Sequence, residues 1–118
     1  MGETGARTRW GVEIKRLFGA ELFSRVVYYD AVGYNTVSSI QMVVITDTHF
    51  YIFPKGAKKL PEPLCCLKDI EGLGSDEKIP DSFRDNINYN ARHVFFTFNG
   101  QPHHLYTFEW NSDLYWRL

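Results

Sequence analysis

Residues 37–53 read VSSIQMVVITDTHFYIF, and this stretch decides the fold class. Two runs of apolar, largely β-branched and aromatic residues, 37–45 and 50–53, flank the polar triplet at 46–48. Such runs predict β-strands, and Thr and Asp between them favour a turn because their side chains bond nearby backbone. The stretch therefore predicts two neighbouring antiparallel strands.

On the N-terminal side, residues 25–29 predict a further strand, and residues 9–23 predict an amphipathic helix. The helix places its apolar residues at helical spacing: Trp10, Ile14, Leu17, Phe18 and Leu22. Such a stripe suits a membrane or a partner, but it more often packs on its own domain, and we favour packing. Residues 1–8 are expected to form a flexible N-terminus.

On the C-terminal side, prolines and glycines mark a loop after residue 53, and the apolar run 64–67 predicts a fourth strand. Residues 74–90 are polar and predict an irregular connection, with a helical turn near 81–85.

Two further strands are predicted at 93–98 and 105–110. Asn99 and Gly100 between them favour the positive φ angles of a tight hairpin. A helix beginning at Asp113 is expected to be cut short at the end of the chain.

The composition fits a single domain over residues 9–118, rich in the aromatics that fill β-sheet cores. The chain has 13 Lys and Arg against 14 Asp and Glu, which argues against a nucleic-acid partner. No apolar stretch is long enough to span a bilayer, and the N-terminus lacks a secretory signal, so we expect a cytoplasmic protein. Cys65 and Cys66 are adjacent, would point to opposite faces of a strand, and are expected to be reduced thiols.

No pattern in the sequence indicates catalysis, a metal or a cofactor. His103 and His104 are adjacent and would face opposite sides of a strand, and His49 and His93 show no ligand spacing with the cysteines. The serine elbow of hydrolases is missing, and the carboxylates are scattered over predicted loops. We therefore expect a protein that is not an enzyme.

Residues 44–53 and 64–73 together resemble the pattern of PH-like domains, the group that includes pleckstrin-homology, GRAM and class I myosin tail domains. In that pattern a strand, a Thr-Asp turn and an aromatic strand precede an Ile-Pro-Leu-x-Asp-Ile segment. Here residues 64–70 read LCCLKDI, so the proline is missing and only the later part matches. The resemblance implies a mostly β fold with flanking helices: a seven-stranded antiparallel sandwich or barrel, plugged at one end by a C-terminal helix.

The resemblance also implies a non-catalytic binding module, which we interpret as a protein-interaction or scaffolding domain of a longer intracellular protein. The alternative is a peripheral membrane module that binds anionic lipids through Lys55, Lys58 and Lys59 in the loop after residue 53. Lysines in exposed loops are also ordinary solubilising residues. The phosphoinositide pocket usual in the family takes basic residues from the first two strands, where residues 25–46 offer only Arg25.

Overall fold

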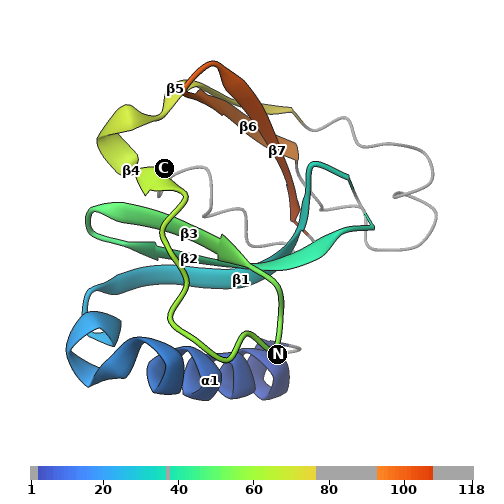
Figure 1. Cartoon of the computed structure of the whole chain (residues 1–118). Coiled ribbons are helices and arrows are strands. Elements are labelled where there is room, and N and C mark those ends of the chain that lie inside the picture. Colours follow the sequence, from blue (N-terminus) through green and yellow to red (C-terminus); the bar gives the residue numbers. More distant parts are fainter. Residues whose placement is uncertain (1–2, 37, 77–92, 108–118) are drawn as a thin grey trace.

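The computed structural model describes residues 3–36, 38–76 and 93–107, which form one helix, a 3-10 turn and seven strands (Figure 1). The helix is α1 (Glu3–Phe23) and the 3-10 turn is η1 (Leu67–Asp69). The strands are β1 (Val26–Tyr34), β2 (Ile40–Thr46), β3 (His49–Phe53), β4 (Cys65–Cys66), β5 (Glu71–Asp76), β6 (His93–Phe98) and β7 (Gln101–Thr107). The predicted mostly β fold with seven antiparallel strands and an N-terminal helix is confirmed.

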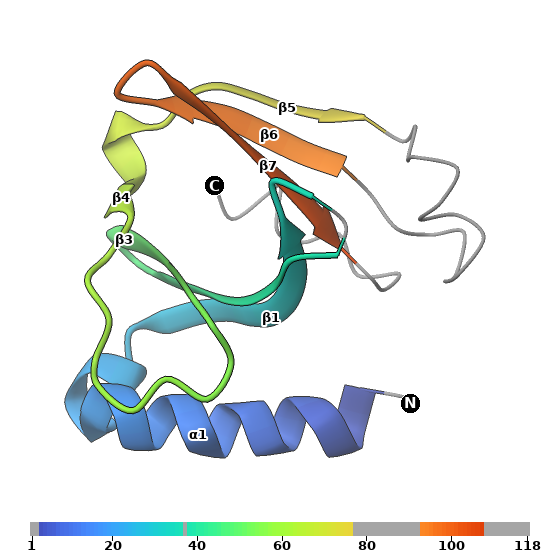
Figure 2. The ribbon, with the colours of Figure 1, turned by 45° about the vertical axis from the view of Figure 1, so that its right-hand side comes forward.

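All seven strands belong to one antiparallel sheet in the order β4-β3-β2-β1-β7-β6-β5. The sheet bends so that β5, β6 and β7 lie over β1, β2 and β3, while α1 covers the opposite side of that second group (Figures 1 and 2). Strand β1 joins the two halves, because it pairs with β2 along most of its length and with β7 at Val32–Tyr34. The described strands form an open, sandwich-like sheet and do not close into a barrel.

The first hydrophobic cluster fills the space between the two halves of the sheet. Its buried members are Tyr28, Val32, Val43, Ile45, Phe50, Cys65, Val94, Phe96 and Leu105. The rings of Phe50 on β3 and Phe96 on β6 meet edge to face with centroids 5.6 Å apart. This geometry is favourable for aromatic pairs, so the pair links the two halves at the centre.

The second hydrophobic cluster lies between α1 and the outer face of β1, β2 and β3. Its buried members are Ile14, Phe18, Ala31, Met42, Val44, Tyr51 and Phe53. Successive residues of a strand point to opposite faces, so β2 sends Met42 and Val44 to this cluster and Val43 and Ile45 to the first. From Met42 onward, strand β2 is therefore buried on both faces, which explains the continuous apolar run at 42–45.

Helix α1 packs on its own domain, as we favoured, and ends at Phe23 as predicted. It begins at Glu3 and not near Arg9, so the predicted helix was too short and part of the segment expected to be flexible is helical. The helix is kinked at Gly19, whose φ of 83° lies in the left-handed region. None of the helices in the described part of the chain is long and apolar enough to cross a membrane.

Strand β5 was not predicted from the sequence, where residues 74–90 were expected to hold no strand. Its glycines have low strand propensity, which explains why it was missed. A Cβ atom on Gly74 would lie 2.4 Å from the ring of Phe95 on the neighbouring strand. Gly72 has a φ of 62°, and the register shifts between Glu71 and Gly74. Glycine at these positions therefore permits a bulge and a close aromatic contact.

The first and last predicted strands have wrong bounds, because β1 (Val26–Tyr34) continues five residues beyond the predicted 25–29 and β7 (Gln101–Thr107) begins four residues before the predicted 105–110. The strand expected at 64–67 shortens to β4, because the chain turns into η1 after Cys66. The predicted tight turn is confirmed, since Asn99 and Gly100 have φ of 56° and 79°, and β7 begins directly after it at Gln101. The helical turn expected at 81–85 and the C-terminal helix expected from Asp113 lie outside the described residues.

Replacing Ile14 tests the packing of α1 on the sheet. Ile14 is 2% exposed, whereas Val12 on the opposite face of the helix is 60% exposed. We expect Ile14→Ala to lower the free energy of unfolding by about 2–5 kcal/mol, because it leaves a cavity in the second cluster. The control Val12→Ala should change it by less than about 0.5 kcal/mol. Denaturant titration measures both, and equal effects would contradict the packing.

Candidate functional site

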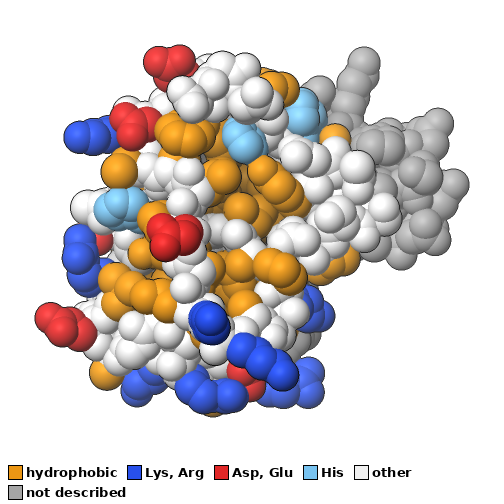
Figure 3. All heavy atoms as spheres, in the orientation of Figure 1, with side chains coloured by type: hydrophobic (Ala, Val, Ile, Leu, Met, Phe, Trp, Pro, Cys, Tyr) orange, Lys and Arg blue, Asp and Glu red, His pale blue; other side chains and the backbone are white. Residues whose placement is uncertain are grey.

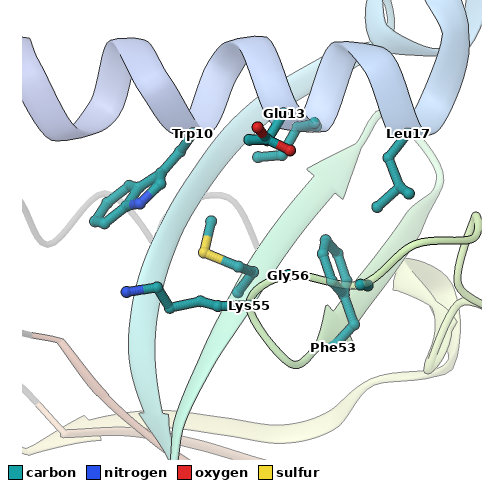
Figure 4. Close-up of a pocket in the computed structure, with 9 residues that line it drawn as sticks. Trp10, Glu13, Leu17, Phe53, Lys55 and Gly56 are labelled. Carbon is teal, nitrogen blue, oxygen red and sulfur yellow. The ribbon is translucent and has the colours of Figure 1, made fainter.

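A pocket of about 300 Å³ opens between α1 and the loop that follows β3 (Figure 4). Helix α1, strands β2 and β3, and the loop all contribute to its lining. The lining residues are Trp10, Glu13, Ile14, Leu17, Met42, Phe53, Lys55, Gly56 and Ala57. The lining is mostly apolar, with one carboxylate and one ammonium group among its side chains.

Local sequence explains how this pocket forms. Trp10, Ile14 and Leu17 are three or four residues apart, so they lie on the same face of α1. Gly56, with a φ of 82°, lets the loop turn, and Ala57 then packs against the second cluster. The loop is thus held beside the helix, and the pocket lies between them.

The two charged groups at the pocket, the Glu13 carboxylate and the Lys55 ammonium, differ in their ionic partners. The carboxylate of Glu13 forms an ion pair with Arg16 one helical turn later. The Lys55 ammonium lies 5.9 Å from the centre of the Trp10 ring, and Figure 4 shows it directed toward the indole. Lys55 has no carboxylate partner among the described residues. The pocket mouth therefore offers a cation next to an apolar surface.

The structure separates the three lysines that the sequence predicted as a lipid-binding set. Lys55 lines the pocket, whereas Lys58 and Lys59 are exposed on the same loop outside it. Lys and Arg side chains gather over the lower part of the face in Figure 3, where Figure 1 places α1. Sequence reasoning weighed a membrane or partner surface for the stripe that includes Trp10 and Leu17 and favoured packing. It did not place these residues at a pocket, because the pocket forms only where α1 and the loop lie side by side.

A second pocket, of about 470 Å³, lies at the other end of β3. Its lining residues are Asp47, Thr48, His49, Cys66, Leu67 and Lys68. The Cys66 Sγ atom lies 3.3 Å from His49 Nε2, and His49 Nδ1 lies 2.8 Å from Thr48 Oγ1. The register of β3 and β4 sets His49 opposite Cys66, which sequence spacing did not indicate. Both cysteines are free thiols, as predicted.

His103 and His104 face opposite sides of β7, as predicted. His103 is buried beside Tyr34, with 2.7 Å between its Nδ1 and the phenol oxygen, whereas His104 Nδ1 lies 2.9 Å from Nε2 of His93. Among the residues that the structure describes, the buried Nε2 of His103 has no hydrogen-bond partner. Burial, with a smaller contribution from His104, lowers the pKa of His103, and burial raises the pKa of Tyr34.

No group of three or more candidate metal ligands occurs in the described part of the chain. A scan against known protein families gives no match for this chain, and a search of curated proteins gives none. The described residues form two candidate sites: a mostly apolar pocket lined by Lys55 and Glu13, and a pocket in which the Cys66 thiol contacts His49.

The lowered pKa of His103 predicts a pH-dependent stability. The unfolded chain binds a proton at this residue more readily than the folded chain, so stability is retained above about pH 6.5 and falls as the pH drops below it. His103→Phe should therefore lose less stability on acidification than the natural chain. Denaturant titrations across this pH range measure the free energy of unfolding of both proteins. The other histidines are present in both, so the difference between the two pH curves reports on His103. Parallel pH curves would contradict a buried neutral imidazole.

Proposed function

We propose that this chain is a non-catalytic PH-like binding module of the protein-interaction class, and that its ligand site is the pocket between α1 and the loop after β3. The bent seven-stranded antiparallel sheet supports the PH-like interpretation. The segments that carry the resemblance coincide with consecutive elements of that sheet, since 44–53 spans the turn from β2 to β3 and 64–73 runs from β4 into β5.

The observation that carries the proposal is the cation at the mouth of an apolar pocket. At about 300 Å³ the pocket is at the small end of ligand sites, so it suits one large apolar side chain better than a whole cofactor. Lys55 would pair with a carboxylate next to that side chain, because Glu13 is already paired with Arg16. The occupant is therefore a segment of a partner protein with an aromatic or aliphatic residue beside Asp or Glu.

A displayed library of peptides with one aromatic or aliphatic residue flanked by Asp and Glu tests this occupant. We expect Lys55→Glu to weaken the selected peptides at least about tenfold, because a charge-assisted contact becomes repulsive. Ala57→Trp should also weaken them by filling the pocket. The control Lys15→Glu makes the same charge change on α1 at a residue outside the pocket lining and should leave affinity nearly unchanged.

Two results would contradict the proposed protein site. One is a library that yields no enriched peptide. The other is a set of enriched peptides that bind the Lys55→Glu and Ala57→Trp variants as tightly as the natural chain, which would place the ligand elsewhere. Thermal unfolding of each variant confirms that the fold is retained before binding is compared.

A second candidate function, binding of anionic membranes, is supported by the exposure of the loop. Lys58 and Lys59 are exposed beside Leu60, whose side chain is 51% exposed, so the loop presents cations and an apolar group together. Arg25 does not add to this surface, since its guanidinium donates to the carboxylate of Asp47 at 2.9 Å. A membrane contact would therefore use the loop and not the phosphoinositide position of the family.

Vesicle sedimentation distinguishes this second candidate. Each lysine near an anionic surface contributes about 1 kcal/mol, so replacing Lys55, Lys58 and Lys59 together by Ala should reduce partition into phosphatidylserine vesicles about hundredfold at low salt. Phosphatidylcholine vesicles serve as the uncharged control and should not sediment the protein. If phosphatidylserine vesicles fail to sediment the natural chain at low salt, the membrane candidate is wrong.

A further inference from the structure

The second pocket is lined by the thiol of Cys66, which contacts a histidine side chain. Cys66 Sγ lies 3.3 Å from His49 Nε2, and the opposite ring nitrogen of His49 lies 2.8 Å from the Thr48 hydroxyl oxygen. A nucleophile next to a base, with a third group orienting that base, is the arrangement that activates cysteines. We infer that Cys66 is a modification site, a thiol that His49 activates for exchange with small disulfides.

The contacts of the pocket accommodate the charged pair that forms when the thiol proton moves to the imidazole. The protonated ring of His49 would donate one N–H to the Cys66 sulfur and the other to Thr48 Oγ1. The guanidinium of Arg25, which lies 3.4 Å from Thr48 Oγ1, is itself paired with Asp47. The existing neighbours can therefore hold the ion pair without rearrangement of the backbone.

The adjacent cysteine provides a natural contrast within the chain. Cys65 is 6% exposed, belongs to the first hydrophobic cluster, and points away from the pocket. Burial, with smaller contributions from Asp69 and Cys66, raises the pKa of Cys65 to about 11. Because the thiolate is the reactive form, Cys65 should be inert at neutral pH.

Access to Cys66 does not require the core to open. Cys66 is half-buried and lines a pocket of about 470 Å³ together with Lys68. Among the described strands, β4 lies at the edge of the sheet, where it pairs with β3. A small disulfide can therefore reach the sulfur from the pocket, and an adduct there leaves both hydrophobic clusters in place.

The reaction we propose is thiol–disulfide exchange with a small disulfide such as glutathione disulfide. The Cys66 thiol gives its proton to His49 Nε2, and its sulfur attacks one sulfur of the disulfide. A new S–S bond joins Cys66 to that half, the original S–S bond breaks, and the departing thiolate takes the proton from His49. Cys66 is oxidised and the departing half is reduced, so no further oxidant is needed. The inference is independent of the proposed ligand pocket.

The test uses two disulfides at neutral pH. The rate at which the protein releases thionitrobenzoate from dithiobis(nitrobenzoate) measures thiol reactivity, and mass spectrometry measures the mass that glutathione disulfide adds to the protein. The natural chain should show one fast thiol, which Cys66→Ser removes and Cys65→Ser retains. His49→Gln should slow this thiol at least about tenfold, because the base is lost. In guanidinium chloride both cysteines should react at similar rates, which shows that the fold and not the local sequence makes the difference.

The Thr48→Val variant provides a second test of the same contact, with a side chain of similar volume. It removes the oxygen that holds His49 Nδ1 and should slow the fast thiol several-fold. Thr36→Val makes the same change at an exposed residue outside the lining of this pocket, and this control should leave the rate unchanged. If His49→Gln does not fold, as judged by circular dichroism, Thr48→Val decides the question. The inference is overturned if Cys65 proves to be the fast thiol. It is also overturned if the folded His49 and Thr48 variants react at the natural rate.

Discussion

Strand β2 lies between two hydrophobic clusters, and the other elements are arranged around its burial. Val43, Val44 and Ile45 have no exposed surface, because one face of β2 meets the bent half of the sheet and the other meets α1. A sheet with only one covered face would expose Met42 and Val44 to water. At about 25 cal/mol per Å² of apolar surface, that exposure is costly, so α1 is an integral layer of the fold.

The position of α1 also creates the first pocket. The helix packs closely through Ile14 and Phe18, whereas Trp10 and Leu17 are only partly covered and lie toward the loop after β3. The loop brings Lys55 to the Trp10 ring but does not fill the space between them. The core and the proposed ligand site therefore share the same helix face, and residues of the pocket differ from core residues mainly in how fully their neighbours cover them.

Strand β3 contributes residues to both pockets described above. Its last residue, Phe53, lines the pocket under α1, while its first residue, His49, pairs with Cys66 at the opposite end. Between them Phe50 anchors the first cluster against Phe96. Both pockets are therefore lined by residues of one strand, which pairs with β2 from Phe50 to Phe53. Side chains placed on a strand are positioned more exactly than side chains on loops.

The sequence by itself determined the local elements: the apolar face of α1, the strands predicted at 37–45, 50–53 and 93–98 to within a few residues, and the turn at Asn99 and Gly100. These follow from hydrophobic period and turn chemistry, which act between near neighbours in the chain. Only the tertiary structure decided that a glycine-rich segment forms β5, that Lys55 lines the pocket beside α1 while Lys58 and Lys59 lie outside that lining, and that His49 meets Cys66. Those outcomes depend on the pairing and packing of segments that are distant in the chain, such as 49–53 with 65–66 and α1 with the loop after β3. Patterns among near neighbours do not specify which distant segments meet.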